Sequence, residues 1–322
     1  MTDQRKNELQ EIYLKSDNLK PDDLIGLDLQ EIIYIYFSIN MKIKNGIKDE
    51  NDDEVLLTVF KAILARIALS DELYVAYNLV TNYPHIDEKG SAWIFSTEEY
   101  AQQAVAHYMQ QMITLKIKKI EKEEFISEFY QFYRLGIGRL LVDNGYYNVI
   151  VYRKDLLSEA VSEDTPKDES SLINPELNLA MISFFQNFYN TSFYNGKQEF
   201  LKKLESNMID CIPSARLLVP VKLEGRMLKS GEISKIDPSE KMQMAYITNE
   251  KDNTRWVPAF TDWDEFVKMY SRTEWNAAVV GYRDLMKMSD KCDGVLINFS
   301  GVPLRIDKEN RKIINECAKV KS

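Results

Sequence analysis

Residues 256–266 read WVPAFTDWDEF, in which two tryptophans, two phenylalanines and a proline are mixed with three acidic residues. The first half is apolar and predicts a strand, with Pro258 at an edge or a bulge because proline cannot donate a ladder hydrogen bond. The second half predicts a helix that begins after Thr261 or Asp262, since either residue can cap the first turn as part of a capping box. This stretch therefore predicts a strand that passes directly into a capped helix.

The three acids of this stretch, Asp262, Asp264 and Glu265, admit two interpretations. Acidic side chains in a first turn stabilise the positive end of the helix dipole, so capping alone accounts for them. Alternatively, they are the working carboxylates of a small-metabolite sensor or a hydrolase-like enzyme, placed in a cleft between two domains. That alternative requires the three side chains to converge on one pocket that holds a perturbed acid. We favour capping, because capped first turns are far more common than catalytic acid pairs.

The overall composition bounds the classes of function. A chain of 322 residues has room for about two domains. Its content of 45% hydrophobic residues can build hydrophobic cores, so we expect a globular protein. The net charge of −9 argues against nucleic acid and anionic membranes as partners, since both attract clustered positive charge.

The chain carries no feature of secretion or membrane insertion that we recognise. Its first ten residues, MTDQRKNELQ, are charged, and the apolar run at residues 32–37 is far shorter than the ~20 residues that span a bilayer. The three cysteines, at positions 211, 292 and 317, are widely spaced and odd in number, which is typical of a reducing compartment. We therefore expect a cytoplasmic protein.

The chain also contains an internal repeat. SARLLVPVKL at residues 214–223 parallels SDELYVAYNL at residues 70–79, and each follows a segment with helical periodicity. DGVLINFSG at residues 293–301 parallels GRLLVDNG at residues 138–145, where Asn-Gly favours a hairpin turn. We expect a duplicated unit that has since diverged.

Further segments extend the repeat. The stretch that opens with Trp256 has a weaker counterpart in Trp93, Phe95 and Ser96, and the strand AAVVGY at residues 277–282 corresponds to LKIKKI at 115–120. In the first copy, Ser96 with Glu99 predicts a second capped helix start. The later copy has a longer insertion after its first strand, at residues 224–241.

These patterns predict an α/β (α+β) protein with two related mixed-sheet domains, each preceded by helical segments. The predicted parts are a helical N-terminal extension at 1–69, a diverged α/β domain at 70–157, an acidic polar linker at 158–172, a helical segment at 173–213 and a second α/β domain at 214–322.

The second copy resembles the SseB family, in particular its N-terminal-type domain, over residues 214–318. The resemblance is carried by LLVPV at 217–221, WVPAFTDWDEF at 256–266, AAVVGY at 277–282 and GVLINFSGVPLRID at 294–307. It implies an α/β domain of a family that is loosely associated with serine sensitivity and has no agreed molecular activity. It transfers no catalytic residue. The first copy is a diverged version that lacks the proline of the strand and has a shorter loop.

We predict no catalytic residue, no cofactor and no metal site. The chain has only two histidines, His85 and His107, whereas a nucleophilic triad needs a positioned base and a zinc site usually needs several close ligands. The pair Gly136 and Gly138 lacks the rest of a dinucleotide-binding fingerprint, and we interpret it as the end of a helix.

The leading hypothesis is a non-enzymatic binding or adaptor protein. Its predicted interaction surface combines Trp256, Asp262, Trp263, Asp264 and Glu265, together with the insertion at 224–241, because tryptophans are common at interaction hot spots. We expect a protein partner, and a basic one, such as a toxin neutralised by an acidic immunity protein, is one form of this idea. A purely structural scaffold is a third possibility, which predicts no concave site and no exposed tryptophan.

Overall fold

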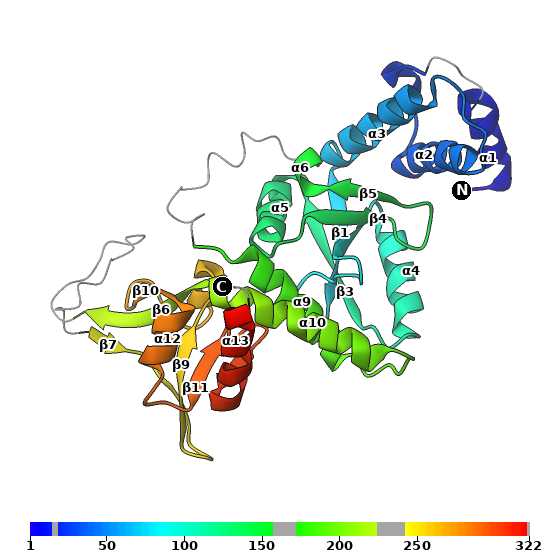
Figure 1. The fold of residues 1–322 in the computed structure, drawn as a ribbon. Coiled ribbons are helices and arrows are strands. Elements are labelled where there is room, and N and C mark those ends of the chain that lie inside the picture. Colours follow the sequence, from blue (N-terminus) through cyan, green and yellow to red (C-terminus); the bar gives the residue numbers. More distant parts are fainter. Residues whose placement is uncertain (15–18, 157–171, 224–241, 321–322) are drawn as a thin grey trace. The chain divides into compact units, whose positions relative to one another are not determined.

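The computed structural model describes residues 1–14, 19–156, 172–223 and 242–320 (Figure 1). The chain forms two compact units. Unit 1 comprises Met1–Leu79, Tyr83–Phe132 and Ile137–Ala160, and unit 2 comprises Val80–Asn82, Tyr133–Gly136 and Val161–Ser322. The insertion at 224–241 and residues 158–171 of the predicted linker lie outside the described residues.

Unit 1 begins with helices and continues as a sheet with helices between its strands. Its helices are α1 (Asp3–Leu9), α2 (Leu29–Lys44), α3 (Asp52–Ala68), α4 (Glu98–Met109), α5 (Phe125–Arg134) and α6 (Arg153–Leu156), with short helical turns η1 (Gln10–Leu14), η2 (Pro21–Leu24) and η3 (Lys122–Glu124). Its strands are β1 (Glu72–Asn78), β2 (Ser91–Phe95), β3 (Leu115–Glu121), β4 (Arg139–Val142) and β5 (Val149–Tyr152). The last two residues of α5 are counted with unit 2.

The five strands of unit 1 form one mixed sheet in the order β3-β1-β2-β4-β5. β2 and β4 are parallel, and every other neighbouring pair is antiparallel. A core of buried aromatic and small residues, among them Trp93, Phe95 and Ala101, joins β2 to α4.

Unit 2 has the same alternation of helices and strands. Its helices are α9 (Pro175–Tyr189), α10 (Lys197–Cys211), α11 (Trp263–Val267), α12 (Tyr282–Met288) and α13 (Lys308–Val320), with the turn η4 (Ile212–Ser214). Its strands are β6 (Arg216–Leu223), β7 (Met242–Met244), β8 (Ile247–Asn249), β9 (Thr254–Ala259), β10 (Asn276–Gly281), β11 (Gly294–Ile297) and β12 (Leu304–Asp307). The α/β fold class is therefore confirmed.

The strands of unit 2 form two sheets, β10-β6-β7 and β12-β11-β9-β8. A bridge between Leu218 and Phe260 links β6 to the residue that follows β9, with backbone hydrogen bonds of 2.8 and 2.9 Å in both directions. β9 and β11 are parallel, whereas β6 with β10 and β11 with β12 are antiparallel.

Through this bridge the chain path of unit 2 matches that of unit 1. The order β10-β6-β9-β11-β12 has the same sequence of parallel and antiparallel neighbours as β3-β1-β2-β4-β5. Two long helices come directly before the first strand in each unit, α2 and α3 before β1 and α9 and α10 before β6, and the matching strands β2 and β9 are each followed by a helix. The shared path is what a duplication predicts, although the duplication itself stays a prediction.

Two prolines explain why the sheet of unit 2 divides. Continuing the register of the Leu218–Phe260 bridge places Pro220 of β6 opposite Pro258 of β9. Neither residue has an N–H to donate, so a ladder cannot continue through them. Beyond this point β6 pairs with β7, and β9 pairs with β8. Pro258 therefore lies where β9 changes partners on one side, while on its other side it pairs with Leu296 of β11.

The repeat is shifted at the tryptophans. Trp93 pairs with Leu141 one rung before the end of β2, and the equivalent rung in unit 2 joins Pro258 to Leu296. Trp256 thus corresponds in register to Ser91 and not to Trp93. Both tryptophans are apolar residues near the start of a strand, so sequence similarity alone aligns them two residues out of step.

The turns predicted from glycine and asparagine are present. Gly136, at φ 75°, follows the end of α5, and an added Cβ would lie 2.2 Å from the carbonyl oxygen of Pro175. β4 and β5 form the predicted hairpin, and its connection holds Asp143 at φ 54° and Gly145 at φ 99°.

Candidate functional site

The five residues of the predicted interaction surface do not lie together on one exposed surface. Trp256, Asp262 and Glu265 are buried, with only 5%, 1% and 1% of their surface exposed. Trp263 is half-buried and Asp264 is exposed. The surface as a whole therefore stays a prediction, which these positions support only for Trp263 and Asp264.

Trp256 is a core residue of β9. Its indole Nε1 donates to Oγ1 of Thr254 at 2.9 Å, and the Arg305 guanidinium lies 4.4 Å from the ring centre. Gly294 faces it on β11, where an added Cβ would lie 2.8 Å from the indole and 2.2 Å from the carbonyl oxygen of Ile306. The glycine leaves the space that the indole needs.

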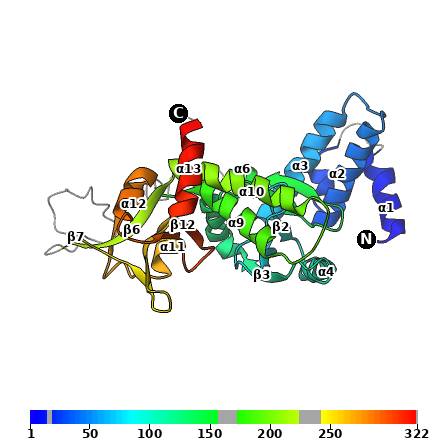
Figure 2. The same ribbon diagram turned by 60° about the horizontal axis from the view of Figure 1, so that its bottom comes forward.

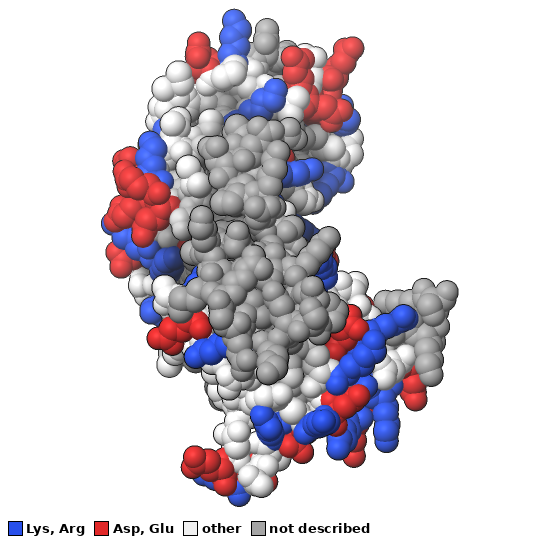
Figure 3. All heavy atoms as spheres, turned by 90° about the vertical axis from the view of Figure 1, so that its left-hand side faces the viewer, with Lys and Arg blue, Asp and Glu red and all other residues white. Residues whose placement is uncertain are grey.

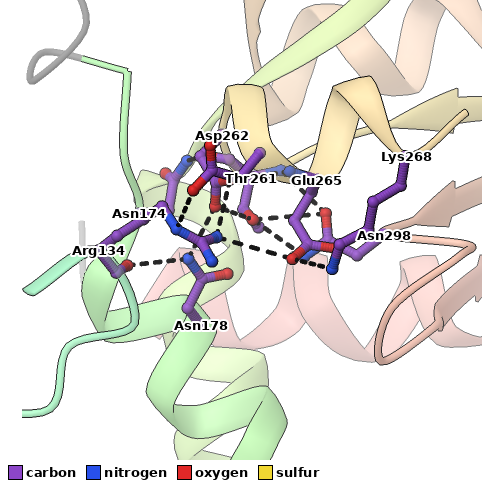
Figure 4. Close-up of polar contacts among 9 residues, drawn as sticks. Arg134, Asn174, Asn178, Thr261, Asp262, Glu265, Lys268 and Asn298 are labelled. Atoms are coloured by element: carbon purple, nitrogen blue, oxygen red, sulfur yellow. Dashed lines mark hydrogen bonds and ion pairs between the residues drawn. The ribbon is translucent and has the colours of Figure 1, made fainter. Parts of the chain in front are cut away.

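Asp262 is the N-cap of α11, as predicted. Its Oδ1 accepts the Glu265 backbone N–H at 3.0 Å and a hydrogen bond from Nη1 of Arg134 at 2.9 Å. Its Oδ2 accepts from the Thr261 hydroxyl at 2.9 Å and from Nδ2 of Asn178 at 3.1 Å (Figure 4). Each carboxylate oxygen thus accepts two hydrogen bonds, and this side chain is fixed from both sides.

Arg134 is the buried counter-charge of this carboxylate. The residue is 5% exposed, and its Nη1 also lies 3.6 Å from Oε1 of Glu265. Its Nε lies 2.8 Å from Oδ2 of Asp264, as an ion pair without the alignment of a hydrogen bond. Burial acts to lower the pKa of Arg134, but the three carboxylates outweigh it and raise that pKa above its ordinary value.

Glu265 has a different role from the one expected for a capping box. Its Oε1 accepts from Nζ of Lys268 at 2.7 Å, one turn further along, and faces Arg134 on the other side. The capping contact of α11 thus runs from Asp262 to the backbone, while the Glu265 side chain serves the ion-pair cluster. Three carboxylates and two cations form this cluster, which we call the α11 cluster: Arg134, Asp262, Asp264, Glu265 and Lys268.

Amide side chains connect the cluster to the strands. Asn174 donates through Nδ2 to the carbonyl oxygens of Arg216 at 2.7 Å and Thr261 at 2.6 Å. Asn298, at φ 52° after β11, accepts the Thr261 backbone N–H at 3.0 Å and donates to its hydroxyl at 2.9 Å. Asn178 donates to the carbonyl oxygen of Arg134 at 3.0 Å. The corner between β9 and α11 is therefore held from several elements of unit 2.

Such an arrangement suits structural support better than acid–base chemistry. A general acid or base must release or take up a proton at an atom that faces a substrate. Both oxygens of Asp262 are already engaged by internal donors, and Asp264 lies against Arg134. Capping and ion pairing account for these carboxylates.

Beside the cluster, α11 contributes to an aromatic face. Trp263, Tyr270 and Trp275 are partly buried and pack on the core that contains Phe260 and Phe266. The ring centroids of Trp263 and Phe266 lie 5.1 Å apart, and those of Tyr270 and Trp275 lie 5.2 Å apart.

Two cations lie over the outer rings of this face. The guanidinium of Arg272 is 4.4 Å from the ring centre of Trp263, and Nζ of Lys222 is 4.5 Å from that of Trp275. We call these five residues, Trp263, Tyr270, Trp275, Arg272 and Lys222, the aromatic face.

The equivalent corner of unit 1, between β2 and α4, has a similar backbone conformation but different side chains. Asp143, at φ 54° after β4, accepts the Ser96 backbone N–H at 2.7 Å and the Ser96 hydroxyl at 2.8 Å. Gln30 donates at 2.7 Å to Oδ2, the same oxygen that accepts the Ser96 hydroxyl, and burial raises the pKa of Asp143. The N-cap of α4 is Thr97, which accepts from the Tyr100 N–H, and not Ser96 as the sequence suggested.

Sequence reasoning missed most partners of Asp262. Arg134 is 128 positions away, and Asn178 is 84 positions away, so no local pattern joins them to α11. A usable signal was an arginine at the end of the aromatic helix that precedes Gly136, because a charge in an apolar segment needs a partner.

Other kinds of site find little support in the described part of the chain. Two pockets of about 280 and 270 Å³ lie in unit 2, and no residue of the α11 cluster lines either of them. Within the described residues, no group of three or more His, Cys, Asp or Glu side chains is placed to hold a metal ion. None of the helices described is both long enough and apolar enough to cross a bilayer.

Comparison with known proteins agrees with the resemblance found in the sequence. Residues 200–310 match the family model described as SseB protein N-terminal domain, which confirms the predicted kinship for this part of the chain. No curated protein matches the chain. Among solved structures, Anabaena Tic22 (protein transport) aligns over 80% of this chain and 96% of its own, at 13% identity and a TM-score of 0.17. At that TM-score the alignment carries no argument about fold or function.

Proposed function

We propose that unit 2, whose residues 200–310 match the SseB N-terminal domain model, is a non-enzymatic binding module that recognises a protein partner through the aromatic face. One observation carries the proposal. The carboxylates that could have served catalysis are engaged inside the unit, while the same helix places Trp263 at the surface under Arg272.

The aromatic face has the physical properties of an interaction hot spot. Its rings are held by contacts with Phe260 and Phe266, so little side-chain freedom is left to lose on binding. Large aromatic side chains that are rigid before binding contribute most of the energy at many interfaces. The α11 cluster acts indirectly, because it fixes the start of the helix that carries Trp263.

The charge of this surface favours a particular kind of partner. The cations Arg272 and Lys222 lie over its rings. We therefore propose a partner segment that places carboxylates beside an apolar side chain. A basic partner, which the whole-chain charge of −9 favours, would have to bind elsewhere on the molecule.

Nucleic acid stays a poor candidate for this chain. Figure 3 shows acidic and basic side chains interspersed, with a group of Lys and Arg at the lower right. On α12 and α13, Lys287 and Arg311 pair with Asp284 at 3.1 Å and with Asp290 at 2.8 Å. Phosphate-backbone binding depends on basic side chains that are not neutralised in this way.

The test is affinity capture with chemical cross-linking, followed by mass spectrometry and calorimetry with the purified partner. The variants are Trp263→Ala with Trp275→Ala, and the charge reversal Arg272→Glu with Lys222→Glu. Arg283→Glu, at an exposed position of α12, is the matched control. We expect both double variants to lose the same partner, with at least ~10-fold weaker binding, while the control keeps it. Identical partners for all four proteins would contradict the proposal.

A further inference from the structure

A second surface of unit 2 lies at the turn between α9 and α10, two helices that run side by side in Figures 1 and 2. The turn exposes four aromatic residues: Phe188 (55%), Tyr189 (41%), Phe193 (93%) and Tyr194 (38%). We call them the aromatic tip. A phenylalanine that is almost fully exposed is unusual, and contiguous exposed apolar side chains mark interaction sites.

The tip is ordered by contacts of its own. Nζ of Lys197 donates to the carbonyl oxygens of Asn190 and Ser192, and the Ser192 N–H donates to Oδ1 of Asn190 at 2.8 Å. On the helix side, the rings of Phe184 and Phe188 are stacked at 5.5 Å. The turn thus holds its aromatic side chains outward before any partner arrives, which lowers the entropy cost of binding.

The four aromatic residues of the tip also lie in an uncharged stretch, and the ammonium of Lys197 beside them is bonded to backbone carbonyl oxygens of the turn. Residues 177–196 contain no Asp, Glu, Lys or Arg, within a chain of net charge −9. Its polar side chains are Asn, Gln, Ser and Thr, which can both donate and accept hydrogen bonds. Aromatic rings, amides and hydroxyls are each complementary to themselves, whereas a charged group meets repulsion from its own copy.

We propose that the aromatic tip binds the aromatic tip of a second copy of this chain, in a two-fold symmetric contact. A two-fold interface brings the same patch of both molecules together, so it requires self-complementary groups. Two chains of net charge −9 repel one another, and an uncharged surface is where that repulsion is least.

The exposed area predicts a weak dimer. Taking ~200 Å² for each fully exposed aromatic side chain, the observed fractions leave about 450 Å² per copy. Two tips that cover each other then bury roughly 900 Å², below the ~1,200 Å² of stable interfaces. We therefore expect a reversible dimer that forms with rising concentration.

The experiment is sedimentation equilibrium of the full chain over a range of concentrations. The test variant is Phe193→Ser with Phe188→Ser, and the control is Phe299→Ser, a phenylalanine that is 44% exposed between β11 and β12. Because Phe193 is 93% exposed, its replacement should leave the fold intact. We expect dimerisation of the wild type and the control, and at least ~10-fold weaker dimerisation of the test variant.

Salt provides an independent readout. Raising the ionic strength screens the repulsion between acidic copies, so the dimer should become tighter or stay unchanged. A dimer held by ion pairs would instead weaken.

Three outcomes would overturn the proposal. They are a monomer at every concentration, a dimer that Phe193→Ser with Phe188→Ser leaves unchanged, or binding to phosphatidylcholine vesicles that requires these residues without any dimer. The aromatic-face variants are expected to dimerise normally, so failure here is distinguishable from failure of the proposed partner site.

Discussion

The two units turn the same corner with a buried acid in different places. In unit 1 the acid is Asp143, after β4, and the helix cap is the neutral Thr97. In unit 2 the residue after β11 is the neutral Asn298, and the acid is the cap, Asp262. The backbone geometry at each corner is alike, since Asp143 and Asn298 have φ values of 54° and 52°.

The same chain path thus accommodates a buried carboxylate at two different positions. Asp143 accepts hydrogen bonds from the neutral groups of Ser96 and Gln30. Asp262 instead lies against the buried guanidinium of Arg134. The two units share one strand order, but the buried carboxylate is stabilised by neutral hydrogen-bond donors in unit 1 and by a guanidinium in unit 2.

The largest expected effect comes from the two helix caps. Asp262→Ala leaves Arg134 buried with less counter-charge, and we expect unfolding of unit 2 to become easier by about 3–5 kcal/mol. Thr97→Ala removes one exposed cap and should cost about 1 kcal/mol in unit 1. Chemical denaturation checks both, since Trp93 reports on unit 1 and the other three tryptophans on unit 2.

A double variant gives the control for the caps. Replacing both partners, Asp262→Asn with Arg134→Met, removes this buried ion pair while Glu265 keeps Lys268 as its counter-charge, and should cost less than Asp262→Ala alone. If Asp262→Ala and Thr97→Ala lowered the free energy of unfolding equally, the ion pair with Arg134 would add nothing to the contribution of the Asp262 cap.

The next effect is a pH dependence confined to unit 1. Both histidines of the chain lie in unit 1, and burial lowers the pKa of His85 to about 4. The unfolded chain binds a proton near pH 6.5 and the folded unit does not, so stability is full above pH 6.5 and falls as the pH drops toward 4. The loss should approach about 3 kcal/mol. Denaturation at several pH values checks it, and His85→Phe should remove most of the slope without altering unit 2.

A smaller effect on stability should distinguish two equivalent strand pairs, Trp256 with Gly294 in unit 2 and Ser91 with Arg139 in unit 1. Gly294, opposite Trp256, corresponds in register to Arg139, opposite Ser91. Gly294→Ala places a methyl group against Ile306 and the indole, so we expect a loss of about 1–3 kcal/mol from overpacking. Arg139→Ala adds no volume, and its effect on thermal unfolding should be smaller. A neutral Gly294→Ala would mean that the indole moves freely.

The smallest effect should come from replacing the buried acid after β4 with the amide that unit 2 has after β11. Asp143→Asn gives unit 1 the residue type that unit 2 has at Asn298. Asparagine tolerates the left-handed backbone and removes the cost of burying a charge, but it also removes one charged hydrogen-bond acceptor. These terms oppose each other, so we expect a change within about 1 kcal/mol in chemical denaturation. A loss of several kcal/mol would show that the two corners are not interchangeable.

Local patterns predicted much of this architecture. The strand ending near Phe260, the cap at Asp262 and the helix end at Gly136 follow from residue types at adjacent positions. The α/β class and the resemblance that residues 200–310 show to the SseB N-terminal domain followed from the same stretches.

The remainder depends on contacts distant in sequence. Nothing near residue 262 indicates that Arg134 lies beside it, and exposure of Trp256 could not be judged without knowing that Gly294 faces it. The predicted interaction surface included buried residues for this reason. Whether a side chain is buried depends on the elements packed against it, which its residue type does not reveal.

The facing prolines of unit 2 have a consequence for how this sheet opens. Pro220 and Pro258 separate the Leu218–Phe260 bridge, which adjoins the corner, from the rungs that β7 and β8 form. Fraying at the far end can therefore stop at the prolines. In hydrogen–deuterium exchange, amides of β7 and β8 should be replaced early while that of Phe260 stays protected. The continuous ladder between β1 and β3 in unit 1 should instead exchange as a single cooperative block.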